Sequence, residues 1–225
     1  MKARVCGGVL ASSMGLFLSG CAGLLHSDAR PEESYYLRAR AAAVTDATQK
    51  AAVSLRVGHP VAAPGLDSPH IMLVQADHRM NFYTGSRWVA PATEVVESLA
   101  VQTLRESGAW TSVEDSGSPF PSDYLLAVDL RRFEADYTAG GALPVVHVVL
   151  ECIVGRREGR DVVATFVAAG DAPAAANRMS GVVAAFEQAS TAAMDVLAQQ
   201  ALQAVRADLQ RAAQNPASPA PSSKR

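Results

Sequence analysis

Three segments in the second half of the chain alternate apolar and polar residues with a period of two, at 124–133, 145–154 and 161–167. The middle segment is the most regular, with a wholly apolar face made of Val146, Val148, Leu150, Cys152 and Val154. This period is typical of strands that bury one face, and an antiparallel sheet accommodates it. The pattern therefore predicts an antiparallel meander with one side buried.

Two other segments have the three- and four-residue spacing of amphipathic helices. The first is Ala92–Ser107, and Gly108 follows it at the position where glycine commonly ends a helix. The second is Arg178–Ala212, which stops before Asn215-Pro216. Its apolar stripe consists of Met179, Val182, Val183, Phe186, Ala189, Ala193, Val196, Leu197, Ala201 and Val205. We expect these two helices to cover the buried face of the sheet.

The first half of the chain contains shorter patterns. Strand patterns lie at 53–57, 71–76 and 80–83, and turns are expected at 77–79 and 84–86. Proline and glycine residues concentrated in 58–69 indicate a loop. Together with the meander and the helices, these patterns predict an α+β fold: a mixed, mostly antiparallel sheet with two helices packed on one face.

The N-terminus has the layout of a secretory signal, with Lys2 and Arg4 before the apolar run Val5–Leu18. Fourteen residues, several of them Gly or Ser, are too few to span a bilayer of about 30 Å. The run ends in Leu18-Ser19-Gly20-Cys21, which resembles the lipobox of bacterial lipoproteins. That resemblance implies cleavage before Cys21 and acylation of its thiol and new amino group, which would anchor the protein to a membrane. The alternative is an ordinary signal peptide with a cysteine nearby by chance.

These patterns divide the chain into four regions. Residues 1–20 are expected to be the lipoprotein signal peptide, 21–33 the lipidated N-terminus and tether, 34–213 one folded domain, and 214–225 a disordered tail rich in Pro, Ser and Ala. Ala22 follows the cysteine, where an aspartate would favour inner-membrane retention under the usual lipoprotein sorting rule. We therefore expect a lipid anchor in the outer membrane, with the domain on the periplasmic face.

Composition and motifs limit the chemistry. The formal net charge is −2, without the basic excess that nucleic-acid binding favours. Cys152 becomes the single free thiol once Cys6 leaves with the signal and Cys21 is acylated, and its strand setting indicates a buried structural residue. The sequence contains no nucleophile-elbow, phosphate-loop or regular metal-ligand motif. We expect no enzyme activity, no cofactor, no metal and no nucleic-acid partner.

One cluster of aromatic and basic residues is a candidate binding site. Tyr83, Arg87 and Trp88 lie close together before Pro91 and the first helix. Trp, Tyr and Arg are enriched at the energetic centres of protein interfaces, so the cluster is a candidate partner-binding patch. The alternative is that Trp88 packs under the helix, with Arg87 covering the ring or capping carbonyl groups. The sequence leaves both interpretations open.

These features occur in an order that resembles the ABC-type transport auxiliary lipoproteins, the family that includes the paraquat-inducible intermembrane transport lipoproteins. The segments that carry the resemblance are the lipobox at Cys21, Ser34–Leu37, Pro60–Leu66, Tyr83 with Arg87–Pro91, Leu99, Leu104 and Gly108, and Asp123–Phe133. The resemblance extends from about residue 34 to 210. It implies that 34–213 is the domain of this family.

The resemblance also implies a role. The protein would be the non-catalytic accessory of an ABC permease and ATPase complex and of a mammalian-cell-entry (MCE) type periplasmic protein. Such systems move lipids or hydrophobic compounds between the inner and outer membranes, and homo-oligomer formation stays an open question. Two other hypotheses are a general envelope lipoprotein for outer-membrane assembly or integrity, and a lipid-anchored hydrolase, which the missing nucleophile motif disfavours.

Overall fold

The computed structural model describes residues 32–38 and 50–214. Its strands are β1 (Glu33–Tyr35), β2 (Ala51–Val57), β3 (Val61–Ala62), β4 (His70–Val74), β5 (Met80–Trp88), β6 (Trp110–Glu114), β7 (Tyr124–Asp136), β8 (Val145–Arg156) and β9 (Val162–Pro173). Its helices are α1 (Ala92–Ser107) and α2 (Met179–Gln214). The signal sequence, Cys21, most of the tether and the tail after Gln214 lie outside the described residues.

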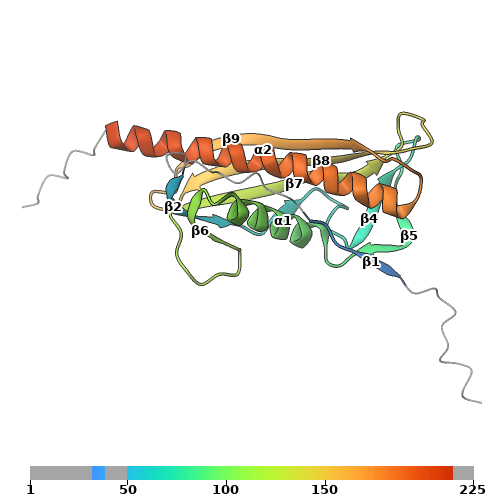
Figure 1. Cartoon of the computed structure of the whole chain (residues 1–225), viewed down its shortest axis with the longest axis horizontal. Helices are drawn as coiled ribbons and strands as arrows, with labels where there is room; N and C mark the ends of the chain where they lie inside the picture. Colours follow the sequence, from blue (N-terminus) through green and yellow to red (C-terminus); the bar gives the residue numbers. More distant parts are fainter. Residues whose placement is uncertain (1–31, 39–49, 215–225) are drawn as a thin grey trace, which may run out of the picture. The chain divides into compact units, whose positions relative to one another are not determined.

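Strands β7, β8 and β9 form the antiparallel meander that the alternation predicts (Figure 1). Tyr124 pairs with Arg156 and Asp136 pairs with Val145, so β7 and β8 are matched along their whole lengths. The ladder between β8 and β9 is about as long. These two ladders hold most of the paired residues of the sheet.

The other edge of β7 is shared by three short strands that run parallel to it. β2 pairs beside residues 124–126, β3 beside 129–130 and β4 beside 134–136. β6 continues the sheet beyond β2, while β5 and then β1 continue it beyond β4. The predicted α+β fold, with a mixed and mostly antiparallel sheet, is confirmed.

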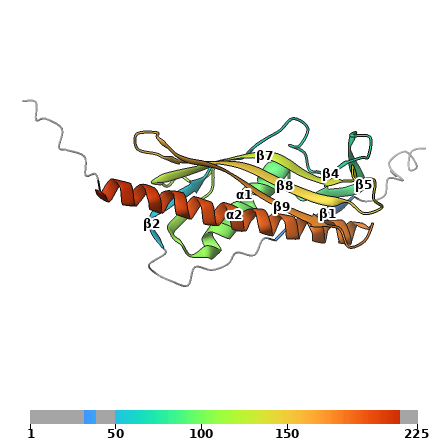
Figure 2. The same cartoon turned by 90° about the horizontal axis from the view of Figure 1, so that it is seen from above.

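The two helices lie on one face of the sheet and contact each other. Helix α2 runs along β9 and β8 (Figures 1 and 2). It approaches β9 closely because small residues face each other there: a Cβ atom placed on Gly170 would lie 2.1 Å from the carbonyl oxygen of Ala189. The alanine-rich composition of α2 thus serves close packing on the sheet. Among the described residues, no helix combines the length and apolarity needed to cross a membrane.

Strand β5 continues through 84–86, so the turn predicted there is wrong. Its pairing with β4 passes from Phe82–Met72 to Arg87–His70, which leaves extra residues on β5 and forms a bulge. Gly85 has a φ of 73°, a left-handed conformation that glycine adopts without steric cost. The bulge changes which face the strand presents, because the exposed Phe82 and the buried Trp88 would otherwise point the same way.

Candidate functional site at the β4–β5 end of the sheet

Trp88 lies in the core, with 0% of its surface exposed. Its ring centroid is 5.7 Å from that of Phe133 on β7 and 5.0 Å from that of Phe186 on α2. The latter pair is edge-to-face, an arrangement that aromatic quadrupoles favour. The indole Nε1–H has no hydrogen-bond partner among the described residues. Trp88 is therefore a packed core residue and not part of an exposed patch, and the aromatic rings that it contacts belong to β7 and α2.

Arg87 and Tyr83 remain closer to the surface. The Arg87 guanidinium lies 3.6 Å from a carboxylate oxygen of Glu32, and its Nε donates to the carbonyl oxygen of Trp88 at 3.3 Å. Because Arg87 and Glu32 are both well exposed, this ion pair contributes little to stability. The half-buried Tyr83 hydroxyl lies 2.9 Å from the hydroxyl of Tyr137, and burial raises its pKa.

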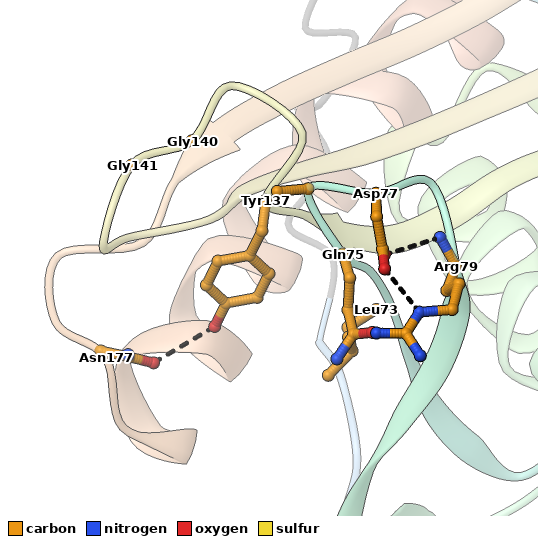
Figure 3. Close-up of a pocket in the computed structure, with 9 residues that line it drawn as sticks. Leu73, Gln75, Asp77, Arg79, Tyr137, Gly140, Gly141 and Asn177 are labelled. Atoms are coloured by element: carbon orange, nitrogen blue, oxygen red, sulfur yellow. Dashed lines mark hydrogen bonds and ion pairs between the residues drawn. The ribbon is translucent and has the colours of Figure 1, made fainter.

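An open pocket of about 620 Å³ lies next to this tyrosine pair (Figure 3). Three segments meet around it: the β4–β5 hairpin, the turn between β7 and β8, and the residues before α2. Its walls are formed by Leu73, Gln75, Ala76, Asp77, Arg79, Tyr137, Gly140, Gly141 and Asn177.

A chain of hydroxyl groups ties these three segments together. Tyr137 donates to the side-chain oxygen of Asn177 at 3.2 Å, so Tyr83 is the donor to Tyr137 (Figure 3). The sequence pattern gave no indication of Tyr137 or Asn177, because each lies in a loop and becomes a neighbour of Tyr83 only through the sheet pairing. Of the predicted residues, Tyr83 therefore lies beside the pocket, whereas Trp88 lies in the core and does not line it.

The charged groups of the pocket neutralise each other. Arg79 Nε lies 2.6 Å from Asp77 Oδ2 in the hairpin turn. Desolvation acts to raise the pKa of Asp77, but hydrogen bonds and the charge from Arg79 outweigh it and lower that pKa. Within the part of the chain that the structure describes, no group of three or more His, Cys, Asp or Glu side chains is placed to hold a metal ion. The lining thus combines hydrogen-bonding side chains with apolar ones such as Leu73 and Ala76.

A second polar cluster, at the other end of β7, fastens the C-terminal half of α2 to the sheet. Asp208 is 4% exposed, and its Oδ2 accepts from the Tyr124 hydroxyl at 2.8 Å and from Arg156 Nη2 at 2.6 Å. Desolvation opposes ionisation, but the bonds from Arg156 and Tyr124 outweigh it and lower the pKa of Asp208. The signal in the sequence is a carboxylate three residues after Val205, on the apolar stripe of the helix.

Cys152 is completely buried in β8, so the prediction of a structural cysteine is confirmed. Burial, and then the charge of Glu151, raise the pKa of its thiol to about 12. At neutral pH the group is a protonated core side chain.

These observations define an α+β domain with an open pocket at one end of its sheet. The chain belongs to the family of ABC-type transport auxiliary lipoprotein components, whose family model matches residues 35–215. This confirms the resemblance seen in the sequence. The family is one of envelope lipoproteins that accompany ABC-type transport.

Solved structures agree with this assignment. A crystal structure of a DUF330-family protein from Xanthomonas campestris is similar with a TM-score of 0.71 and 31% identity, covering 79% of this chain and 99% of that one. An uncharacterized protein is similar with a TM-score of 0.59 and 13% identity, covering 76% and 99% of the two chains, and shows the fold alone. A search of curated proteins finds no match.

Proposed function

We propose that this protein is an outer-membrane-anchored periplasmic lipoprotein and the non-catalytic accessory of an ABC transporter with an MCE-type periplasmic protein. The system would move lipids or other hydrophobic compounds between the inner and outer membranes. The observation that carries the proposal is the match of the transport-auxiliary family over residues 35–215. The lipobox at Cys21, which precedes the matched region by a short segment, supports the anchor.

The anchor and the domain have separate tasks in this proposal. Cleavage after residue 20 and acylation of Cys21 hold the chain in the outer membrane, because several acyl chains bind firmly where a single one does not. Residues 21–33 are the tether, 34–213 form the transport-auxiliary domain, and 214–225 form a tail. Ala22 after the acylated cysteine supports the outer rather than the inner membrane.

The partner surface proposed for the periplasmic protein is the part of β5 that carries Tyr83, beside the pocket, and Arg87, further along the strand. Arg87 is exposed and makes only a weak ion pair with Glu32, so it can be re-paired by an acidic group at small cost. Trp88 contributes from beneath, since its buried ring fixes the strand that carries both residues. The hydrogen bonds that link Tyr83, Tyr137 and Asn177 hold three segments together, so this surface is preorganised for a partner.

The test is crosslinking of the natively expressed protein in cells, followed by recovery and mass spectrometry of its companions. Recovery of an MCE-type protein with its permease and ATPase supports the proposal. Recovery of outer-membrane assembly or cell-wall proteins alone would instead support the general envelope lipoprotein. The mass of crosslinked species of this chain alone reports whether it forms a homo-oligomer.

Two variants sharpen that experiment. Arg87→Glu reverses an exposed charge and is expected to lower recovery of the partner without changing stability. Val162→Glu, a surface change far from the pocket, is the matched control. Cys21→Ser should give an unacylated precursor, and finding acyl groups on that variant would contradict the anchor.

A further inference from the structure

We infer that the outward face of the β4–β5 hairpin, centred on Met80 and Phe82, rests on the surface of the bilayer that holds the lipid anchor. The inference rests on the proposed function, because it requires the acylated Cys21. It adds a membrane-contact surface on the folded domain and an orientation of that domain relative to the membrane.

The first observation is the direction in which the chain enters the domain. β1 pairs with β5 in parallel, with Glu33 opposite Ser86 and Tyr35 opposite Trp88. Because the strands are parallel, the N-terminal end of β1 is directed toward the beginning of β5, at Met80. Figure 1 places β1, β4 and β5 together at the same end of the sheet. The backbone therefore enters β1 from the end of the sheet that holds the β4–β5 hairpin.

The second observation is the reach of that sequence. Twelve peptide steps separate Cys21 from Glu33, which allow at most about 40 Å when fully extended. Ser86, opposite Glu33, lies six residues from Met80, which is at most about 20 Å at roughly 3.3 Å per residue because the bulge at Gly85 shortens the path. The reach of the tether is thus about twice this distance, so an anchor at Cys21 allows the hairpin tip to reach the same bilayer.

The third observation is the chemistry of the face. Met80 is 48% exposed and Phe82 is 44% exposed, and their cross-strand partners are Val74 and Met72. Side chains of paired residues lie on the same face of a sheet, so these four apolar groups are adjacent. The ring of His70 stacks on Phe82 with centroids 4.4 Å apart. Exposed Phe and Met side chains match the apolar surface of a membrane-interfacial segment. The carboxylates of Glu134 and Asp136, which lie beside Met72 and Val74 on the same face, are both paired with Arg132.

This face is turned away from the helices and the pocket. Met72 pairs with Glu134, whereas the preceding residue, Phe133, points into the core against Phe186 of α2. Met72, and with it Phe82, therefore lies on the opposite side of the sheet. The outward face of the meander differs in character, because Arg131 there forms ion pairs with Asp129 and Glu151. Charges of this kind disfavour contact with the apolar part of a bilayer.

A small apolar face is sufficient because the anchor is already in the membrane. Tethering converts the contact of the domain with the bilayer into an intramolecular event with a high effective concentration. Two half-exposed apolar side chains then orient the domain without having to hold it at the membrane by themselves.

The experiment uses the acylated protein, purified from membranes and reconstituted into vesicles of phosphatidylethanolamine and phosphatidylglycerol. Acylation of Cys21 is first verified by mass spectrometry. Single cysteines at Met80→Cys and, as the matched control, Val162→Cys carry the fluorophore NBD. Val162 is 68% exposed and pairs with Gly155, which lies opposite Leu125 at the far end of β7. Cys152 is buried and does not compete for the label.

The expected result is a blue-shifted emission and quenching by doxyl-labelled lipid at position 80, with severalfold lower quenching at position 162. Equal quenching at the two positions in protein that is acylated would overturn the inference and leave the proposed anchor intact. Protection of position 80 that appears only after a protein partner is added would also overturn it, because the face would then be a protein contact. Absence of acyl groups on Cys21 would contradict the proposed function itself, before any fluorescence is measured.

Discussion

Replacing Trp88 by alanine should cost a large part of the stability of the domain. The side chain is fully buried and joins β5 to Phe133 of β7 and Phe186 of α2. Truncation of a buried Trp or Phe to Ala typically costs about 3–5 kcal/mol, from lost transfer free energy and the cavity that remains. The two aromatic contacts place Trp88→Ala in the upper part of that range.

The assay is urea and thermal unfolding of the unacylated mature chain that begins after Cys21. For a domain of this size, a loss of about 3–5 kcal/mol corresponds to a fall in melting temperature of roughly 6–20 °C. The urea midpoint should fall without a change in the m-value, since the surface exposed on unfolding stays nearly the same. Val89→Ala is the matched control: Val89 is 57% exposed, and its truncation should stay within about 0.5 kcal/mol.

Trp88→Phe separates packing from polarity at the same position. It retains an aromatic ring and removes the Nε1–H, which has no partner among the described residues. Its cost should therefore be well below that of Trp88→Ala, because the loss of volume is offset by removal of an unsatisfied polar group. A Trp88→Ala loss of less than about 1 kcal/mol, together with abolished partner binding, would refute the packing argument and favour the interface interpretation.

Three further predictions concern other parts of the fold. Asp208→Asn should destabilise by about 1–2 kcal/mol at pH 7, because a charge-assisted bond to Arg156 becomes a neutral one. Since the pKa of Asp208 is lowered in the folded state, its contribution is present above the unfolded value of about 3.9 and is lost as pH falls through the lowered value, so wild type and variant should converge in acid unfolding curves. Gly170→Ala should prevent native packing of α2, because a Cβ would lie 2.1 Å from the Ala189 carbonyl oxygen, and near-native stability in thermal unfolding would contradict this. In the mature chain with Cys21 replaced, Cys152 should react with a thiol reagent at neutral pH only after urea unfolding, whereas rapid native-state reaction would contradict its burial.

The bounds of the helices and of the long strands follow from local patterns in the sequence. Ala92–Ser107 is helical as predicted, since its apolar spacing, Pro91 before it and Gly108 after it all act within the segment. The strand at 145–154 could likewise be predicted from its own residues, because their alternation only requires that one face of the strand is buried and the other exposed. Cys152 could be assigned to the core for the same reason.

The parallel pairings could not be predicted in this way. β2, β3 and β4 are each too short to carry a distinctive pattern, and their places beside consecutive parts of β7 depend on the whole sheet. The residues around Gly85 predict a turn, because glycine is common both in turns and in bulges, and only the pairing with β4 distinguishes the two. Because of that bulge, Trp88 points into the core while Phe82 points to the opposite side of the sheet.

The family and fold class of this protein could be inferred from the sequence alone, because short motifs, alternating strands and amphipathic helices are local patterns that do not depend on distant contacts. Tertiary structure decided what each candidate residue does. In the folded domain, the Trp88 ring is buried, and Asp208 pairs with Arg156. Tyr83, Tyr137 and Asn177 are linked by hydrogen bonds beside a pocket. The hydrogen-bonded pairs among these residues lie 40 to 54 positions apart in the chain. The physical reason is that such contacts depend on sheet register and on the direction of each strand, which no local pattern records.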